Sequence, residues 1–333
     1  MKRTMLSLCL KNTVAPPSRR YAHGRDADAT EVFGNTLSVT IARFGAMCCV
    51  ALMGACAPAP AGKAPTSQPT PQRIITIAPN AAEIIAALGA ADRLVGVSEF
   101  CVYPASLRAL PRVGGLFNPD LESILRLNPD LVIIRGSAPG VERLCLDAGI
   151  RMYHDPTEDL EDIFTAISQL GEILNRPSEA GALASKMRRR IAAITDAVKD
   201  KSRPRVFFSI ARDPTSLSRV SSAGADTFVD SLITLAGGEN VFGDLDIAYP
   251  EVSLEDILTA RPEVIIEAMP EKDATPDLER RVIQQWRSLG MMPAVRDGRI
   301  YILTEANLLI PSPRVVDSLA RLAALLHPEV MLD

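Results

Sequence analysis

Two stretches of the chain, LESILRLNPDLVII at residues 121–134 and LEDILTARPEVIIE at residues 254–267, share one pattern. Each begins with Leu-Glu, continues with Ile-Leu, reaches a proline followed by an acid, and ends in an apolar run. The first half predicts a short helix, and the apolar run is typical of a parallel strand covered on both faces. The copies lie 133 residues apart. The simplest interpretation is two αβ lobes of one plan, the alternative being a chance likeness of two unrelated units.

Strands and helices also alternate on the N-terminal side of the first copy. Residues 73–78 are a β-branched run that predicts a strand, and residues 94–97 predict a second strand. Residues 80–88 predict a helix with Asn80 as its N-cap, and Gly89 ends it. Alternating strands and helices imply a parallel sheet, so the fold class is α/β.

A long helical segment separates the two copies. Asp155-Pro156-Thr157-Glu158 has the residues of a helix start, with a cap, a proline at the first position and an acid at the third. A second helix follows from Pro177 to about Lys201, which is roughly 35 Å of helix. A helix of this length can bridge two lobes and would limit their closure. We expect a first lobe, linking helices and a second lobe at residues 73–155, 156–202 and 203–333.

The N-terminal region resembles an export leader. Phe44–Ala55 is a run of 12 uncharged residues after Arg43, too short to span a bilayer and followed by Cys56. The order Leu-Met-Gly-Ala-Cys is similar to a bacterial lipoprotein signal, in which the cysteine is lipidated; the alternative is a buried helix end. Residues 1–55 are therefore predicted to be a leader, and the 43 residues before the apolar run indicate a true start codon nearer to it. Residues 56–72, with five prolines, predict an extended tether.

Composition excludes several classes of function. The chain has 333 residues, 36 Lys and Arg, 40 Asp and Glu, and a net charge of −4. Residues 1–55 carry seven basic and three acidic residues, so removing them takes the net charge to −8. An acidic protein of this kind is not expected to bind nucleic acid.

The remaining histidines and cysteines leave little catalytic or metal chemistry. The sequence has no G-x-S-x-G, G-x-x-x-x-G-K-[ST], H-E-x-x-H or G-x-G-x-x-G motif. Beyond the leader only His154 and His327 remain, too few and too far apart for a transition-metal site. Cys101 and Cys145 are a possible disulfide in an exported protein. We therefore expect a binding protein without catalytic residues, bound metal or resident cofactor.

Motifs along the chain from Arg73 to about Pro328 resemble those of one family. They are IAPNAAEIIAALGAADRLVGVS (77–98), VYP (102–104), NPDLESILRLNPDLVII (118–134), AGGENVF (236–242), YPEVSLEDILTARPEVIIE (249–267), PAVRDGRIY (293–301) and PSPR (311–314). The chain is similar to the substrate-binding proteins of ABC importers that carry cobalamin, haem and iron–siderophores. The resemblance implies class III architecture, with two Rossmann-like lobes that have parallel sheets and are joined by a long rigid backbone helix.

The same resemblance implies a set of functional residues. Tyr103 and Tyr249 would contact the ligand, one from each lobe, since rigid aromatic faces suit a large flat chelate. Phe117, Asn307 and Arg314 are further ligand candidates by position. Glu122 and Glu255, the paired acids of the repeat, would dock on the importer permease.

The motif around the second copy is most similar to that of cobalamin-binding members, so the expected ligand is cobalamin or a similar metal chelate. Haem or a ferric siderophore is the alternative, in which Tyr103 or Tyr249 could be an axial ligand and Arg314 could pair with a carboxylate. An enzyme on a related two-lobed scaffold is disfavoured by the lipoprotein-like leader and the missing nucleophile motif. The expected partners are the cognate permease, the chelate and a membrane reached through the lipid anchor.

Overall fold

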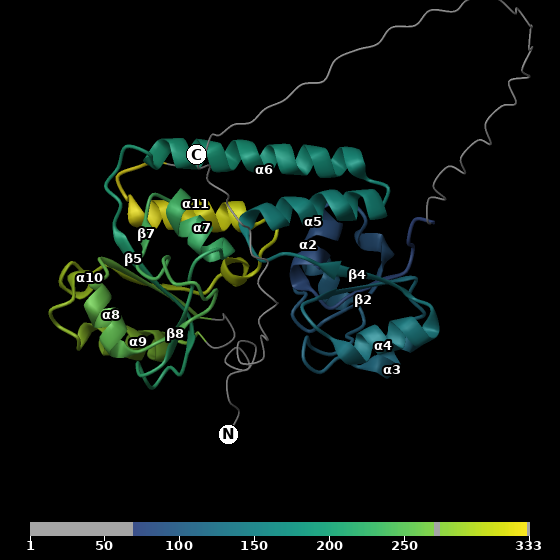
Figure 1. The fold of residues 1–333 in the computed structure, drawn as a ribbon, viewed down its shortest axis with the longest axis horizontal. Helices are drawn as coiled ribbons and strands as arrows, with labels where there is room; N and C mark the ends of the chain where they lie inside the picture. Colours follow the sequence, from purple (N-terminus) through teal and green to yellow (C-terminus); the bar gives the residue numbers. More distant parts are fainter. Residues whose placement is uncertain (1–68, 270–273, 332–333) are drawn as a thin grey trace, which may run out of the picture. The chain divides into compact units, whose positions relative to one another are not determined.

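The computed structural model describes residues 69–269 and 274–331, and the predicted leader, Cys56 and most of the tether lie outside these residues. The described part forms an α/β protein with two sheets (Figure 1). The elements of the first lobe and the linking helices are β1 (Ile74–Thr76), α2 (Pro79–Ala87), η1 (Ala91–Arg93), β2 (Leu94–Val97), η2 (Ala105–Ala109), α3 (Leu121–Arg126), β3 (Leu131–Arg135), α4 (Pro139–Ala148), β4 (Arg151–Asp155), α5 (Leu160–Ile173) and α6 (Pro177–Val198). The elements of the second lobe are β5 (Arg205–Arg212), β6 (Val220–Ser222), α7 (Phe228–Leu235), β7 (Glu239–Asn240), β8 (Glu251–Val252), α8 (Leu254–Ala260), β9 (Val264–Ala268), α9 (Pro276–Arg287), α10 (Pro293–Arg296), β10 (Ile300–Leu303), η3 (Ala306–Leu309) and α11 (Val315–Leu326).

The two sheets differ in their strand directions. The first sheet has the order β2-β1-β3-β4 and is parallel throughout, as predicted. In the second sheet β10, β9, β5 and β7 pair in parallel, whereas β6 pairs antiparallel with both β5 and β8. The prediction of a second parallel sheet is therefore corrected to a mixed one, because the short segment after β5 turns directly back on it instead of crossing through a helix.

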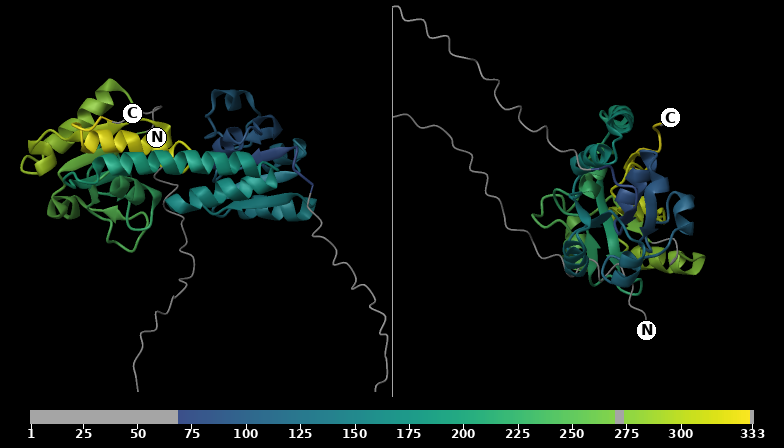
Figure 2. Two further views of the ribbon diagram at one scale, coloured as in Figure 1. Left: turned by 90° about the horizontal axis from the view of Figure 1, so that it is seen from above. Right: turned by 90° about the vertical axis from the view of Figure 1, so that its right-hand side faces the viewer.

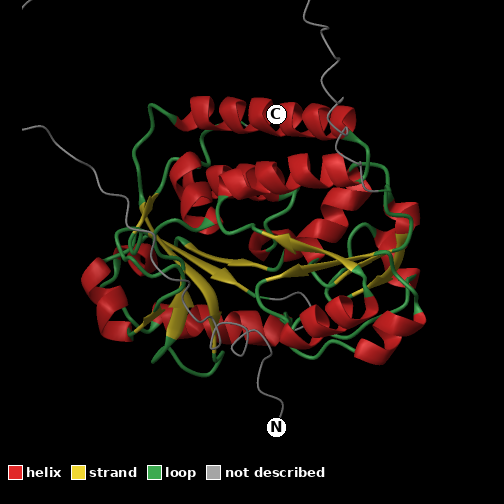
Figure 3. Ribbon diagram, turned by 45° about the vertical axis from the view of Figure 1, so that its right-hand side comes forward, coloured by secondary structure: helices red, strands yellow, loops and turns green. Residues whose placement is uncertain are grey.

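The internal repeat corresponds to two equivalent helix–strand units. Its first copy forms α3 and β3, and its second copy forms α8 and β9. Both helices begin at the leucine of the repeat, and both are capped by the preceding side chain, Asp120 or Ser253. The apolar ends of both copies are buried central strands, with helices on both sides of the strands in Figure 3. The sequence pattern thus predicted both units within one or two residues.

Helices α5 and α6 lie side by side and run in opposite directions (Figures 1 and 2), and they contact each other. α6 is 22 residues long, about 33 Å, and also contacts α7 and α11 of the second lobe. The two helices approach closely at Gly171, where a Cβ atom would lie 2.5 Å from that of Ala180. The described helices include none that is long and apolar enough to cross a bilayer.

Two helix starts differ from the sequence-based predictions. α2 begins with Pro79, so Asn80 lies inside the helix and its buried side chain bonds to Asp155. Asp155, which was predicted to cap a helix, is instead the last residue of β4. α5 starts at Leu160, where Asp159 and Asp162 form a reciprocal capping box. Asp159, four residues after Asp155, therefore marks the start of the helix, because its capping box with Asp162 bonds the free backbone N–H groups there.

One hydrophobic core runs through both lobes and the linking helices. It includes Ile74 and Ile133 of the first sheet, Ile167 of α5, and Val206 and Ile266 of the second sheet. Separate clusters cover the opposite face of each sheet. Because the inner faces of the two sheets share one core with α5, α6, α7 and α11, separating the lobes would expose much apolar surface.

The outer core of the second lobe contains a buried ion pair. The side chains of Arg212 and Glu267 are 1% and 5% exposed, and Nε of Arg212 lies 2.8 Å from Oε1 of Glu267. Trp286 is fully buried, and its indole nitrogen donates to Oε2 of Glu267 at 2.9 Å. Burial raises the pKa of Glu267, and the charge of Arg212 opposes this shift.

We predict that Glu267→Gln lowers the free energy of unfolding by about 3–5 kcal/mol, because it leaves the Arg212 cation buried without a counter-charge. Urea unfolding measures this loss. Asp147→Asn is the matched control, since it breaks the exposed pair between Arg143 and Asp147 and should cost less than about 1 kcal/mol. Equal effects in the two variants would contradict the assignment of Glu267 to a buried charge network.

Candidate functional site

Tyr103 lies at the junction of the two lobes. It precedes η2, its Tyr103–Pro104 peptide bond is cis, and the residue is 47% exposed. The guanidinium carbon of Arg314 lies 3.9 Å from the centroid of its ring. Arg314 directly precedes α11, so the contact joins two segments that are far apart in the sequence. The structure therefore brings together two of the predicted ligand residues.

Arg314 is also bound to Glu83 of α2. Nε of Arg314 donates to Oε2 of Glu83 at 2.8 Å, and the terminal nitrogen Nη2 pairs with Oε1. The hydroxyl of Ser312 donates to the same Oε2 atom at 2.6 Å. The Glu83 side chain is only 4% exposed. Sequence reasoning gave neither Glu83 nor Ser312 a role at the ligand site, since only the fold brings α2 next to the PSPR segment.

Tyr249 lies just before β8 and packs partly buried against the shared core. Burial raises the pKa of its phenol, while the charge of Arg135 lowers it and that of Glu158 raises it. Arg135 ends β3, and Glu158 lies between β4 and α5. Tyr249 of the second lobe thus meets charged groups of the first lobe and of the linking segment.

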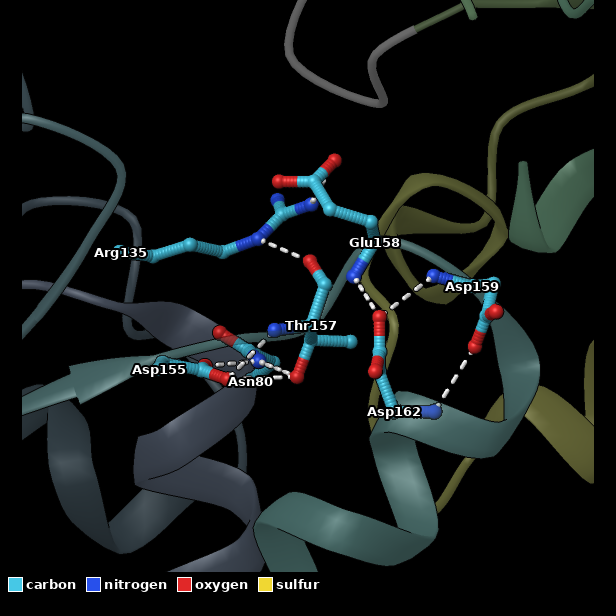
Figure 4. A network of polar contacts seen from close by, with 7 residues as sticks. All are labelled: Asn80, Arg135, Asp155, Thr157, Glu158, Asp159 and Asp162. Carbon is cyan, nitrogen blue, oxygen red and sulfur yellow. Dashed lines mark hydrogen bonds and ion pairs between the residues drawn. The ribbon is translucent and has the colours of Figure 1, made fainter. Parts of the chain in front are cut away.

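A polar network fixes the segment between β4 and α5 (Figure 4). The buried carboxylate of Asp155 accepts hydrogen bonds from Nδ2 of Asn80, from the Thr157 hydroxyl and, at 3.1 Å, from the Thr157 backbone N–H. Nε of Arg135 donates to the Thr157 carbonyl at 2.8 Å, and its Nη2 lies 3.8 Å from Oε2 of Glu158. The network holds Arg135 and Glu158 where the first lobe meets the linking helices.

The remaining ligand candidates are less closely tied to the lobe junction. Phe117 is 52% exposed in the loop before α3. The aromatic pairs among the described residues, Phe207 with Phe242 and with Trp286, do not include it. Asn307 lies in η3, and its amide nitrogen donates to the Ser318 hydroxyl at 2.8 Å. Asn307 is thus held by α11, and its role toward a ligand stays a prediction.

Glu122 and Glu255 occupy the same place in the two repeat units. Each is the second residue of its helix, α3 or α8, and each side chain is exposed. The Glu122 side chain lies 3.9 Å from Arg126, and both are largely in solvent. The structure therefore leaves both carboxylates accessible to a partner.

The possible disulfide is not formed. Cys101 and Cys145 are both free and buried. Cys101 belongs to the core shared by the lobes, whereas Cys145 belongs to the cluster on the opposite face of the first sheet. The sheet lies between the two thiols, so the pairing considered from the sequence is corrected. Burial raises the pKa of both cysteine thiols.

A separate groove of about 450 Å³ lies between α5 and α6. It includes Phe164 and Arg188, whose guanidinium lies 4.2 Å from the ring centroid. None of the predicted ligand residues lines this groove.

The sequence profile of the periplasmic binding protein family matches residues 74–306, which is most of the described chain. The chain belongs to this family. The vitamin B12-binding protein of Vibrio parahaemolyticus is 30% identical over 251 residues, covering 74% of this chain and 86% of that protein. The family and this relative are binding proteins, so this periplasmic binding protein is not an enzyme.

Two solved structures support the same assignment. The periplasmic vitamin B12-binding protein of Vibrio cholerae is 27% identical, with a TM-score of 0.66 over 78% of this chain and 98% of that one. The apo periplasmic haem-binding protein of Roseiflexus sp. RS-1 is 28% identical, with a TM-score of 0.66 over 77% and 98% of the two chains. The predicted class III two-lobed architecture is confirmed by these likenesses.

We predict that Tyr249→Phe removes one phenol that ionises above pH 10, because burial raises the pKa of Tyr249 from that ordinary value. A raised pKa means that the unfolded chain loses this proton first. The stability linked to Tyr249 is therefore fully present below pH 10 and is lost as the pH rises toward the folded pKa. Ultraviolet titration of wild type and variant measures the difference. If the phenol that wild type has and the variant lacks ionises at or below pH 10, the buried position of Tyr249 is contradicted.

Proposed function

We propose that this periplasmic binding protein takes up cobalamin, or a similar metal chelate, between its two lobes and delivers it to the permease of an ABC importer. The observation that carries the proposal is that Tyr103 of the first lobe lies at the lobe junction, half-exposed, against Arg314 of the second. The likeness to the vitamin B12-binding protein of Vibrio parahaemolyticus over 86% of its length supports this ligand class.

The chemistry of the junction suits a large flat ligand. Tyr103 offers a rigid ring on the side of the first lobe, and Tyr249 offers a half-buried ring on the side of the second. Aromatic faces bind an extended apolar macrocycle with little loss of side-chain entropy. Arg314, which lies over the Tyr103 ring, and Asn307 of η3 would bind amide or carboxylate groups at the edge of the macrocycle.

Haem is the second candidate, since the haem-binding protein of Roseiflexus has the same fold at 28% identity. In that case a tyrosinate would ligate the iron. Tyr249 is poorly suited to this role, because burial raises the pKa of its phenol and so stabilises the protonated form. Tyr103 would be the haem ligand, and its ring is the more accessible of the two.

We also propose the steps before and after ligand binding. The leader would direct export, and Cys56 would carry a lipid anchor joined to the folded part by residues 57–72. Glu122 and Glu255, one in each lobe, would dock on basic residues of the permease. Such exposed charges steer association and lose strength as salt is added.

We predict tight one-to-one binding of cyanocobalamin to the protein lacking its leader. Tyr103→Ala and Tyr249→Ala should each weaken this binding about tenfold, because each removes an aromatic wall worth about 1.4 kcal/mol. Calorimetric titration measures the dissociation constants. Leu146→Ala is the control, since Leu146 is an exposed apolar residue of α4 and should leave binding unchanged. Failure of cyanocobalamin to bind wild type would shift the proposal to haem or a ferric siderophore, to be tested with hemin.

We predict that the double variant Glu122→Gln/Glu255→Gln binds cyanocobalamin as wild type does. Cells that carry it should take up cyanocobalamin about tenfold more slowly, because the protein loses two charge contacts with the permease. Glu161→Gln is the matched control, because Glu161 is also an exposed acid in the first turn of a helix. Normal uptake by the double variant would exclude the docking role.

A further inference from the structure

The Glu83 carboxylate is the centre of a bonded cluster that joins the two lobes. It accepts from Nε and Nη2 of Arg314 and from the hydroxyl of Ser312. The backbone N–H of Arg314 in turn donates to the Ser312 hydroxyl at 3.2 Å. Glu83 lies on α2 of the first lobe, and its two partners lie 229 and 231 residues later in the chain. The cluster is thus a cross-lobe contact made by a nearly buried acid.

This pairing fixes both the position and the effective charge of Arg314. With two nitrogens bound to one carboxylate, the guanidinium plane has a single favoured orientation. That orientation places its carbon 3.9 Å from the centroid of the Tyr103 ring. The side chain of Arg314 is 21% exposed, so a ligand at Tyr103 would meet a cation whose charge is largely cancelled by Glu83.

The charge near Tyr249 is balanced in a looser way. Nη2 of Arg135 lies 3.8 Å from the carboxylate of Glu158, and both groups act on the Tyr249 phenol. Each candidate ligand tyrosine therefore has an arginine near it, and each arginine has a carboxylate partner. Pairing with a carboxylate reduces the net positive charge that either of these two arginines presents to an anionic ligand.

We infer that Glu83 is a positioning and specificity-determining residue of the ligand site: it holds the guanidinium of Arg314 over Tyr103 and cancels its charge, so that the site favours an amide-bearing chelate over one that carries carboxylates. This inference rests on the proposed function, because it concerns the same site and names the ligand class within it. A corrin ring bears neutral amides, whereas haem bears two carboxylates, and only haem gains from an unpaired Arg314. Glu83 would thus act on the ligand through Arg314.

The test compares the dissociation constants of cyanocobalamin and hemin for wild type and Glu83→Gln. The glutamine keeps the size of the side chain and one oxygen acceptor but removes the charge. We expect the ratio of hemin affinity to cyanocobalamin affinity to rise about fivefold or more. A change of this size corresponds to the interaction energy of one partly exposed charge pair. The gain in hemin binding should shrink as salt is added. Glu305→Gln is the matched control, since it breaks the exposed pair of Glu305 with Arg321 and should leave the ratio unchanged.

A second variant tests the same inference from the opposite direction. Arg314→Gln leaves the Glu83 carboxylate unpaired, so the affinity ratio should fall about fivefold, because hemin carboxylates are repelled. This measurement decides the question if Glu83→Gln does not fold, as judged by circular dichroism and thermal melting. Ratios that stay at the wild-type value in the folded variants would overturn the inference and leave a purely structural role for Glu83.

The outcomes separate this inference from the proposed function. If wild type binds neither chelate, the proposed ligand class fails. If wild type binds cyanocobalamin and the ratio does not change in the variants, the inference fails and the proposed function stands. If wild type already binds hemin more tightly than cyanocobalamin, the inference is overturned as well, because paired arginines then do not disfavour carboxylates.

Discussion

The structure depends on one shared apolar core between the inner faces of its two sheets. Strands β1 and β3 contribute from one lobe and β5 and β9 from the other, and helices α5, α6, α7 and α11 pack with them. If each lobe had its own core, the two lobes could move apart and expose little apolar surface. Here the same buried side chains stabilise both lobes and their relative position, because burial of this surface is the dominant favourable term in folding.

The shared core also explains where polar groups can meet. The Glu83 carboxylate and the Asp155 carboxylate both lie beside it, each nearly buried and each with several hydrogen-bond donors. A buried carboxylate without donors would be strongly unfavourable, so these groups hold their partners in defined positions. Through them α2 fixes both the segment before α11 and the segment before α5. The surroundings of Tyr103 and Tyr249 therefore depend on the lobe junction and not on either lobe alone.

The sequence predicted much of the fold because its signals are local. The repeat predicted α3 with β3 and α8 with β9, and the continuous apolar runs identified their strands as buried. Asp159 shows the limit of local reasoning: Asp155 and Asp159 both precede plausible helix starts, and only the capping box of Asp159 with Asp162 decides between them. The strands β6 and β8, which pair antiparallel with each other, were not predicted, because strands of two or three residues carry too little pattern.

The sequence by itself determined the α/β class, which residues form the repeat, and that Glu122 and Glu255 occupy matching places in it; the motifs shared with a known family added the binding-protein assignment and the two candidate ligand tyrosines. Those conclusions need only periodicity, caps and motifs within short windows. The tertiary structure alone decided that Glu83 binds Arg314 across 231 residues, that Arg314 covers Tyr103, and that Cys101 and Cys145 stay apart. Such contacts are set by how the two sheets pack around their common core, and no short stretch of sequence contains that information.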